Sequence, residues 1–197
     1  MTDATLLQSP GQAAHAFRAV LASFSTPATP VKIALASDAP APLLPAAATV
    51  LLTLADYQTP VWLSPTLNVD VVRKYLRFHT GATLTTVSQD AAFALLTAEE
   101  TGADMPAFNL GSQEYPDRAT TVIIQVPNFD DGLSVTVSGP GLMQPTEVRV
   151  NEAALGLWSH IQNNNSLFPM GYDFMFASAT TLMALPRSSH IEVKELA

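Results

Sequence analysis

The segment TTVIIQVPNFDDGLSVTV, residues 120–137, decides the class of fold. Its two ends, 120–126 and 133–137, are rich in the β-branched residues that favour strands. Between them the sequence NFDDG, residues 128–132, has the asparagine, aspartates and glycine that are typical of a turn. We therefore expect an antiparallel hairpin here, and with it a β-sheet in the second half of the chain.

Short apolar runs of the same kind occur on both sides of this pair. The run TVLLTLA, residues 49–55, is almost continuously apolar, which is typical of a central strand covered on both faces. Five further runs predict strands, at 31–35, 61–63, 93–97, 172–177 and 181–185.

Three segments carry apolar residues at helical spacing. The first begins at SPGQ, residues 9–12, where Ser9 has the position of an N-cap. The second covers 68–79 and the third 151–162. The residues expected to face the core are Ala13, Phe17, Val20, Leu21 and Phe24, then Val69, Val72, Tyr75 and Leu76, then Leu155, Trp158 and Ile161. Strands flanked by helices predict an α/β fold, a three-layer mixed sheet, in one domain covering residues 1–197.

The composition limits the partners. Charged residues make up 13% of the chain, against roughly 25% in an average soluble domain, and hydrophobic residues make up 48%. We therefore expect other proteins to cover part of the surface. The formal net charge of −8 argues against nucleic acid, and no apolar run is long enough for a membrane span. Without cysteine, and without a basic region followed by an apolar one at its start, the chain is expected in the cytoplasm.

Two short motifs offer groups that bind anions. In SGPG, residues 138–141, Gly139 and Gly141 allow a tight turn whose amides can face a phosphate, but an ordinary turn is the explanation that we favour. In LPRSSH, residues 185–190, Arg187 and His190 lie close enough along the chain to grip a phosphorylated ligand. The alternative for Arg187 is a surface arginine at the end of a strand.

Acidic residues at strand ends give candidates for acid-base chemistry. Asp173 begins an apolar strand, where a carboxylate either binds a ligand or accepts hydrogen bonds from nearby amides. Asp56 follows the run 49–55 in a similar position. Arg77 and His79 at a helix end either bind an anion or satisfy the last carbonyl groups, and we favour the second explanation.

The remaining side chains predict neither a metal site nor a catalytic centre. The histidines lack the spacing that metal sites commonly use, and they are His15, His79, His160 and His190. No serine occupies a nucleophile elbow of the Gly-X-Ser-X-Gly type. We therefore expect no metal and assign no catalytic residue.

Seven phrases, in this order, resemble the H subunit family of the bacterial carbon-phosphorus lyase system. They are HAFR at 15–18, LLTLADYQTPVWLS at 51–64, LRFHTGA at 76–82, GSQEYPDRATTVII at 111–124, SGPGL at 138–142, NNSLFPMGYDFMF at 164–176 and ALPRSSHIEV at 184–193. Together they extend from about residue 10 to residue 193. One departure is Pro27-Ala28, where many members have Pro-Gly, and it concerns only the local turn.

This resemblance implies a cytoplasmic α/β protein with a fold similar to that of the pyridoxal-phosphate-dependent transferases, without the cofactor. None of Lys32, Lys74 and Lys194 lies in a context resembling the Schiff-base lysine of those enzymes. It implies partners, subunits G, I and J, and a homodimer when the chain is isolated. It also implies a supporting role when the system forms alpha-D-ribose 1-methylphosphonate 5-triphosphate from ATP and methylphosphonate and releases adenine. The alternative is a stand-alone phosphate- or phosphonate-binding α/β hydrolase or transferase, with Asp173 or Asp56 as its acid-base residue.

Overall fold

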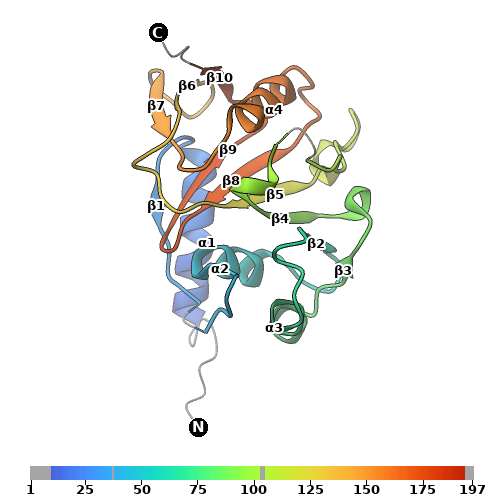
Figure 1. Ribbon diagram of the computed structural model, residues 1–197. Coiled ribbons are helices and arrows are strands. Elements are labelled where there is room, and N and C mark those ends of the chain that lie inside the picture. Colours follow the sequence, from blue (N-terminus) through green and yellow to red (C-terminus); the bar gives the residue numbers. More distant parts are fainter. Residues whose placement is uncertain (1–9, 37, 103–104, 194–197) are drawn as a thin grey trace.

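The computed structural model describes residues 10–36, 38–102 and 105–193, and in these residues its centre is a seven-stranded mixed sheet (Figure 1). Five neighbouring strands are parallel to one another. At one edge of these five, β9 pairs antiparallel with β8, and β1 pairs antiparallel with β9. In sheet order the strands are β1 (Val31–Lys32), β9 (Thr181–Leu185), β8 (Asp173–Ala177), β5 (Thr121–Gln125), β4 (Phe93–Thr97), β2 (Val61–Leu63) and β3 (Leu84–Thr85). The expected N-cap Ser9 and the lysine Lys194 lie outside the described residues.

A second, smaller antiparallel sheet has the order β10-β6-β7. Its strands are β6 (Ser134–Ser138), β7 (Thr146–Arg149) and β10 (His190–Val193). The predicted hairpin is therefore wrong: β5 and β6 are strands, but they belong to different sheets. The burial patterns give the reason, because four consecutive residues of β5 are buried and require cover on both faces, whereas burial alternates along β6 and suits a sheet with one partly exposed face.

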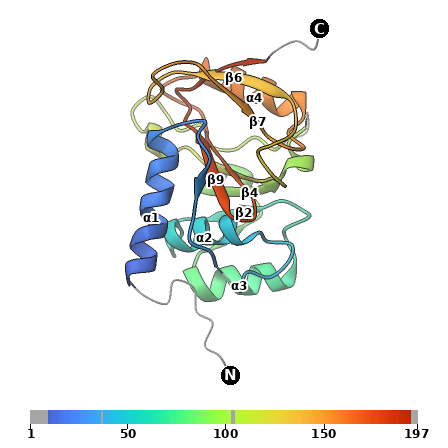
Figure 2. The same ribbon diagram turned by 90° about the vertical axis from the view of Figure 1, so that its left-hand side faces the viewer.

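Helices cover the two faces of the central sheet unequally (Figure 2). The helices α1 (Pro10–Ser25), α2 (Pro45–Leu54) and α3 (Asp70–Thr80) lie on one face, and α4 (Leu155–Asn165) and the small sheet lie on the other. Side chains alternate between the two cores: Leu95, Ile123 and Met175 face the three helices, and Leu96, Ile124 and Phe176 face α4. The expectation of a mixed sheet flanked by helices is confirmed. In the described part of the chain three short 3₁₀ helices complete the elements: η1 (Ser88–Asp90), η2 (Ala98–Glu100) and η3 (Pro116–Arg118).

The run TVLLTLA does not form the predicted central strand, since it lies in helix α2. Pro45 stands at the first helical position and three alanines follow it, so the helix begins before the apolar run. Six consecutive residues, 46–51, are buried between α1, α3 and the sheet. A helix buried on nearly all sides has no polar face, and its sequence then resembles that of a buried strand.

Two of the predicted helical stripes are displaced. In α1 the buried residues are Ala16, Ala19, Val20 and Ser23, while Phe17 is 45% and Leu21 51% exposed. Small side chains allow α1 to approach α2 closely, which turns the larger apolar residues to the flank of the contact. In α4, Trp158 and Ile161 are buried as expected, but Leu155, the first helical residue, is 60% exposed.

A buried threonine in α2 provides a test of the helical packing. Thr49 Oγ1 accepts a hydrogen bond from the Ala36 N–H at 2.8 Å and donates one to the Pro45 carbonyl at 2.9 Å. Thr49→Val keeps the shape but leaves the buried Ala36 amide without its partner, which should lower the free energy of unfolding by about 2 kcal/mol. Urea denaturation measures this difference.

The matched control is Thr53→Val, one turn further along α2. Thr53 Oγ1 donates only to the Thr49 carbonyl within the same helix, so this change should cost less than about 0.5 kcal/mol. Equal losses in the two variants would contradict the role given to Thr49.

Candidate functional site

The candidates Asp173 and Arg187 form one ion pair at the start of β8. The antiparallel register places Phe174 opposite Leu185, so the residue before Phe174 faces the chain leaving β9. Arg187 Nη2 donates to Asp173 Oδ2 at 2.6 Å, and Nε donates to Oδ1 at 3.2 Å. The backbone N–H of Arg187 also donates to Oδ1, at 2.9 Å. Strand pairing thus brings the two side chains together in a bidentate contact.

The same guanidinium joins two loops. Arg187 Nη1 donates to the carbonyl of Pro116 at 2.6 Å and to that of Pro169 at 3.4 Å. The side chains of Arg187 and Asp173 are 13% and 24% exposed. Most of the donors of Arg187, and its charge, are therefore already used within the protein, which limits what it can offer to an anionic ligand.

His190 and Gly139 lie next to this ion pair in the small sheet. His190 is exposed at the start of β10 and pairs with Ser138. A cavity of about 260 Å³ is lined by Pro140, Asn165, Phe168, Ser188 and His190. A second cavity, of about 390 Å³, contains Asp173 and Arg187 and shares Phe168 and Ser188 with the first. The structure therefore brings Asp173, Arg187 and His190 into two adjoining cavities.

The two glycines of the SGPG turn have separate surroundings. Gly139 has φ +132°, and a Cβ there would lie 3.0 Å from the carbonyl oxygen of Ser188, so Gly139 packs against a residue that lines both cavities without lining either itself. Gly141 has φ +87° and faces the end of α1, where a Cβ would lie 2.8 Å from the Ser25 carbonyl oxygen. Close backbone packing explains Gly141, and Gly141 is not among the residues lining either cavity.

The remaining polar candidates lie in a turn and at the end of a helix. Asp56 follows a helix, contrary to the expected strand, and its Oδ1 accepts hydrogen bonds from the Gln58 N–H at 2.8 Å and the Thr59 hydroxyl at 3.1 Å. His79 Nε2 lies 3.8 Å from Asp38 Oδ2. The carbonyl of Arg77 accepts the amide of the left-handed cap Gly81, at 3.0 Å. These contacts make Asp56 part of a turn and place Arg77 and His79 in the last turn of α3.

A cavity at the opposite edge of the sheet was missed by the sequence analysis. It has a volume of about 280 Å³ and is lined by Trp62, Ser64, Pro65, Leu96, Glu100 and Pro106. Glu100 accepts hydrogen bonds from the backbone amides of Thr66 and Thr97, both at 3.0 Å. Burial raises the pKa of Glu100, but the hydrogen bonds from Thr66 and Thr97 help to outweigh it, and the pKa is lowered overall. The capping-box pattern from Thr97 to Glu100 was the sequence signal that could have identified this carboxylate.

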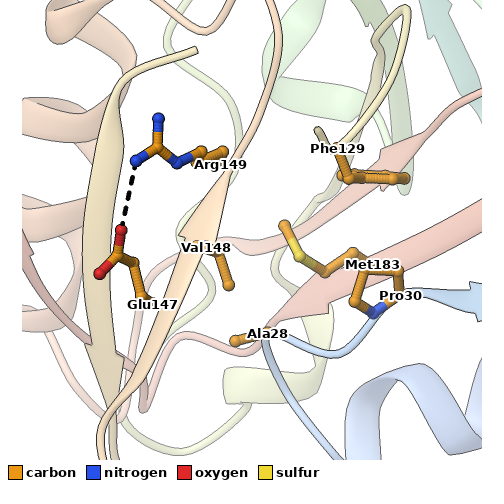
Figure 3. Close-up of a pocket in the computed structure, with 7 residues that line it drawn as sticks. All are labelled: Ala28, Pro30, Phe129, Glu147, Val148, Arg149 and Met183. Atoms are coloured by element: carbon orange, nitrogen blue, oxygen red, sulfur yellow. Dashed lines mark ion pairs between the residues drawn. The ribbon is translucent and has the colours of Figure 1, made fainter. Parts of the chain in front are cut away.

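A further cavity, shown in Figure 3, lies between β7 and β9. Its volume is about 280 Å³, and Val148, Phe129 and Met183 supply much of its wall. Glu147 and Arg149 on β7 are paired with each other, at 3.5 Å. With its charges paired in this way, this cavity offers little to a charged ligand.

These features define an α/β protein whose most prominent polar cluster ties loops together at the amino edge of a parallel sheet. Among the described residues no group of three or more histidine, aspartate or glutamate side chains is placed to hold a metal ion, and no helix is long and apolar enough to cross a membrane. The family model of the bacterial phosphonate metabolism protein (PhnH) matches residues 5–192, and the chain belongs to this family.

Two relatives agree with this assignment. The chain is 35% identical over 187 residues to the "Alpha-D-ribose 1-methylphosphonate 5-triphosphate synthase subunit PhnH" of Rhizobium meliloti (strain 1021), a match that covers 92% of this chain and 90% of the relative. It is 33% identical over 85 residues to the "Putative C-P lyase subunit protein HtxG" of Stutzerimonas stutzeri, covering 43% and 44% of the two chains. The family resemblance expected from the seven sequence phrases is confirmed.

The ion pair of Asp173 and Arg187 gives a second prediction. Arg187→Ala leaves a partly buried carboxylate unpaired and frees the carbonyls of Pro116 and Pro169, so the free energy of unfolding should fall by about 3 kcal/mol. The control is Arg118→Ala, whose exposed guanidinium lies 4.2 Å from the ring centroid of Tyr115 and should contribute less than about 1 kcal/mol. If urea denaturation shows no difference between the two variants, Arg187 does not tie the loops together.

Proposed function

We propose that this chain is a subunit of the carbon-phosphorus lyase core complex in phosphonate catabolism. In this role it supports the formation of alpha-D-ribose 1-methylphosphonate 5-triphosphate from ATP and methylphosphonate, with release of adenine. The observation that carries the proposal is the similarity, over nearly the full length of both chains, to a protein named as a subunit of that synthase. The partners proposed are subunits G, I and J.

The contacts of the polar candidates support an indirect role in the reaction. Asp173 is held by three hydrogen bonds from Arg187, and Asp56 is held in a turn by Gln58 and Thr59. A general base must be directed at a substrate proton within hydrogen-bond reach, whereas these hydrogen bonds direct both carboxylates toward neighbouring parts of the protein. Both carboxylates that were candidates for acid-base chemistry instead stabilise local structure, which favours a supporting subunit over a stand-alone enzyme.

The surface of the helical layer supports assembly with other proteins. Phe17 and Leu21 form an exposed apolar stripe on α1. Val71 and Phe78, which are 49% and 81% exposed, form a second stripe on α3. Large exposed apolar side chains that share a helix face favour a protein partner, because covering them removes apolar area from water. We propose that at least one of these two stripes lies in an interface of the complex.

Four further points complete the proposal. The isolated chain is a homodimer, it works in the cytoplasm, and it functions as a single domain. Its fold is related to that of the pyridoxal-phosphate-dependent transferases without use of the cofactor. The mixed sheet flanked by helices on both faces is compatible with that relationship.

Co-expression tests the proposed assembly. The tagged chain, produced with the other phosphonate-catabolism proteins of its own genome, should co-purify as a stoichiometric complex whose mass is measured by native mass spectrometry. Adenine release from ATP with methylphosphonate should require the complete set of subunits. A lone chain that releases adenine by itself would contradict the supporting role.

Surface variants of the same complex test the stripes. Phe17→Ser with Leu21→Ser, and Val71→Ser with Phe78→Ser, remove the two stripes separately, and at least one pair should lower the yield of complex about tenfold or more. Met143→Ser is the control, because Met143 is fully exposed on the turn between β6 and β7 and belongs to neither stripe. Normal assembly of both double variants would exclude these stripes as interface.

A second candidate function is binding of a phosphate or phosphonate group in the adjoining cavities of Ser188, His190 and Arg187, with Asp173 holding Arg187 and Gly139 packed against Ser188. The observation that favours it is that donors on Ser188, His190 and Arg187 share this region. Calorimetric titration with methylphosphonate should then show binding that His190→Ala weakens at least about threefold, through the loss of one hydrogen bond. His160→Ala, on the partly exposed side of α4, should have no effect.

Absence of methylphosphonate binding by the parent protein, or equal losses in the two histidine variants, would remove this second candidate. Neither result bears on the assembly proposal, because co-purification does not depend on that cavity.

A further inference from the structure

The cavity that contains Glu100 lies where the order of the parallel strands reverses. From β2 the chain passes through α3 to β3 on one side, whereas from β4 it continues to β5 and β8 on the other. The helix α3 packs on the helical face, while Ala98 and Phe108 of the segment after β4 pack in the opposite core. In open α/β sheets, ligands bind outside the carboxyl ends of the strands at such a reversal point.

The lining residues follow these strand ends directly. Trp62 lies in β2, and Ser64 and Pro65 come immediately after it. Leu96 lies near the end of β4, and Glu100 ends the 3₁₀ helix η2 that follows. With Pro106 these residues enclose about 280 Å³, near the lower end of the volumes that hold small ligands. A group of one or two fused rings fits this size.

Aromatic and proline side chains give the cavity flat apolar walls. The indole of Trp62 is fixed by Phe108, whose ring centroid lies 5.4 Å away at an interplanar angle of 71°. Pro65, Pro106 and Leu96 supply the rest of the apolar surface. A held indole offers a face on which a planar ring can stack.

The polar groups of this cavity select for hydrogen-bond donors. Glu100 is a partly exposed carboxylate, and the two backbone amides and the Thr97 hydroxyl that donate to it occupy only part of its acceptor capacity. The hydroxyl of Ser64 is fully buried beside it. Since Glu100 carries a negative charge, phosphate and carboxylate groups are disfavoured and N–H groups are favoured.

We propose that this cavity binds a flat nitrogen heterocycle carrying an amino group, which stacks on Trp62 and donates hydrogen bonds to Glu100. The inference goes beyond the proposed function and does not rest on it, because it concerns a small ligand of the chain itself. The competing explanation is that Glu100 only organises its loop, through the capping box with Thr97. Only the proposed binding site predicts that a ring with an amino group binds more tightly than the same ring without it.

The experiment compares two probes that differ by one amino group, 2-aminopurine and purine, on the full-length chain. Calorimetry should give a Kd for 2-aminopurine on the order of 1 mM or tighter, and about tenfold weaker binding of purine, since a hydrogen bond to a charged acceptor is lost. The fluorescence of 2-aminopurine should be quenched on binding, and Trp62→Leu should reduce both the quenching and the affinity. This comparison of the two probes needs no variant of Glu100.

The carboxylate is tested by Glu100→Gln, with Glu99→Gln on the same short helix as its control. Glu99 is exposed and lines a different cavity, with Gln125 and Glu152. Glu100→Gln should weaken 2-aminopurine about tenfold and leave purine unchanged, while Glu99→Gln should change neither. Three results would each overturn the proposal: no binding of 2-aminopurine by the parent chain, equal affinity for the two probes, or equal effects of the two variants.

Discussion

Burial of the three central strands on both faces is the constraint on which the rest of the structure depends. In β4, β5 and β8 successive side chains point alternately into two separate cores, and most of them are buried. A layer on one face alone would leave the apolar side chains of the other face in water. The chain must therefore supply helices on one face of the sheet and a second layer on the other. The helix α2 and the small sheet with α4 meet that requirement, and the connections between the strands are arranged accordingly.

Much of this architecture was predictable from the sequence, because the period of apolar residues is a local property. The strands at 93–97, 120–126 and 181–185 and the helix at 68–79 were located closely in this way. Two predictions failed for a shared reason. The run at 49–55 is a helix with no polar face, and the segment at 128–132 passes from one layer to another instead of closing a hairpin. In both cases the outcome depends on which elements cover the segment, and a local sequence pattern does not contain that information.

The candidate site was predictable to a similar extent. Sequence proximity in LPRSSH grouped Arg187 with His190, and the structure places these two residues in adjoining cavities and brings Asp173 beside Arg187 by strand pairing. The sequence did not show at which edge of the sheet each residue lies. Asp173 begins β8 and so lies at the amino edge of the parallel strands, whereas Ser64 and Glu100 follow β2 and β4 at the carboxyl edge. Strand direction and order therefore separate two polar clusters, and only the cluster of Asp173 and Arg187 was a candidate from the sequence.

The strands at the two edges of the central sheet have a consequence for how this protein associates. Both β1 and β3 are only two residues long, and the two edge strands of the small sheet carry charged residues, Glu147 and Arg149 on β7 and Glu192 on β10. Each edge therefore offers a short or charged ladder on which a foreign strand gains few backbone hydrogen bonds. A chain with so few charges is thereby protected from polymerising strand by strand. Its contacts with other molecules are then made by side chains, whose shapes and charges can distinguish one partner from another.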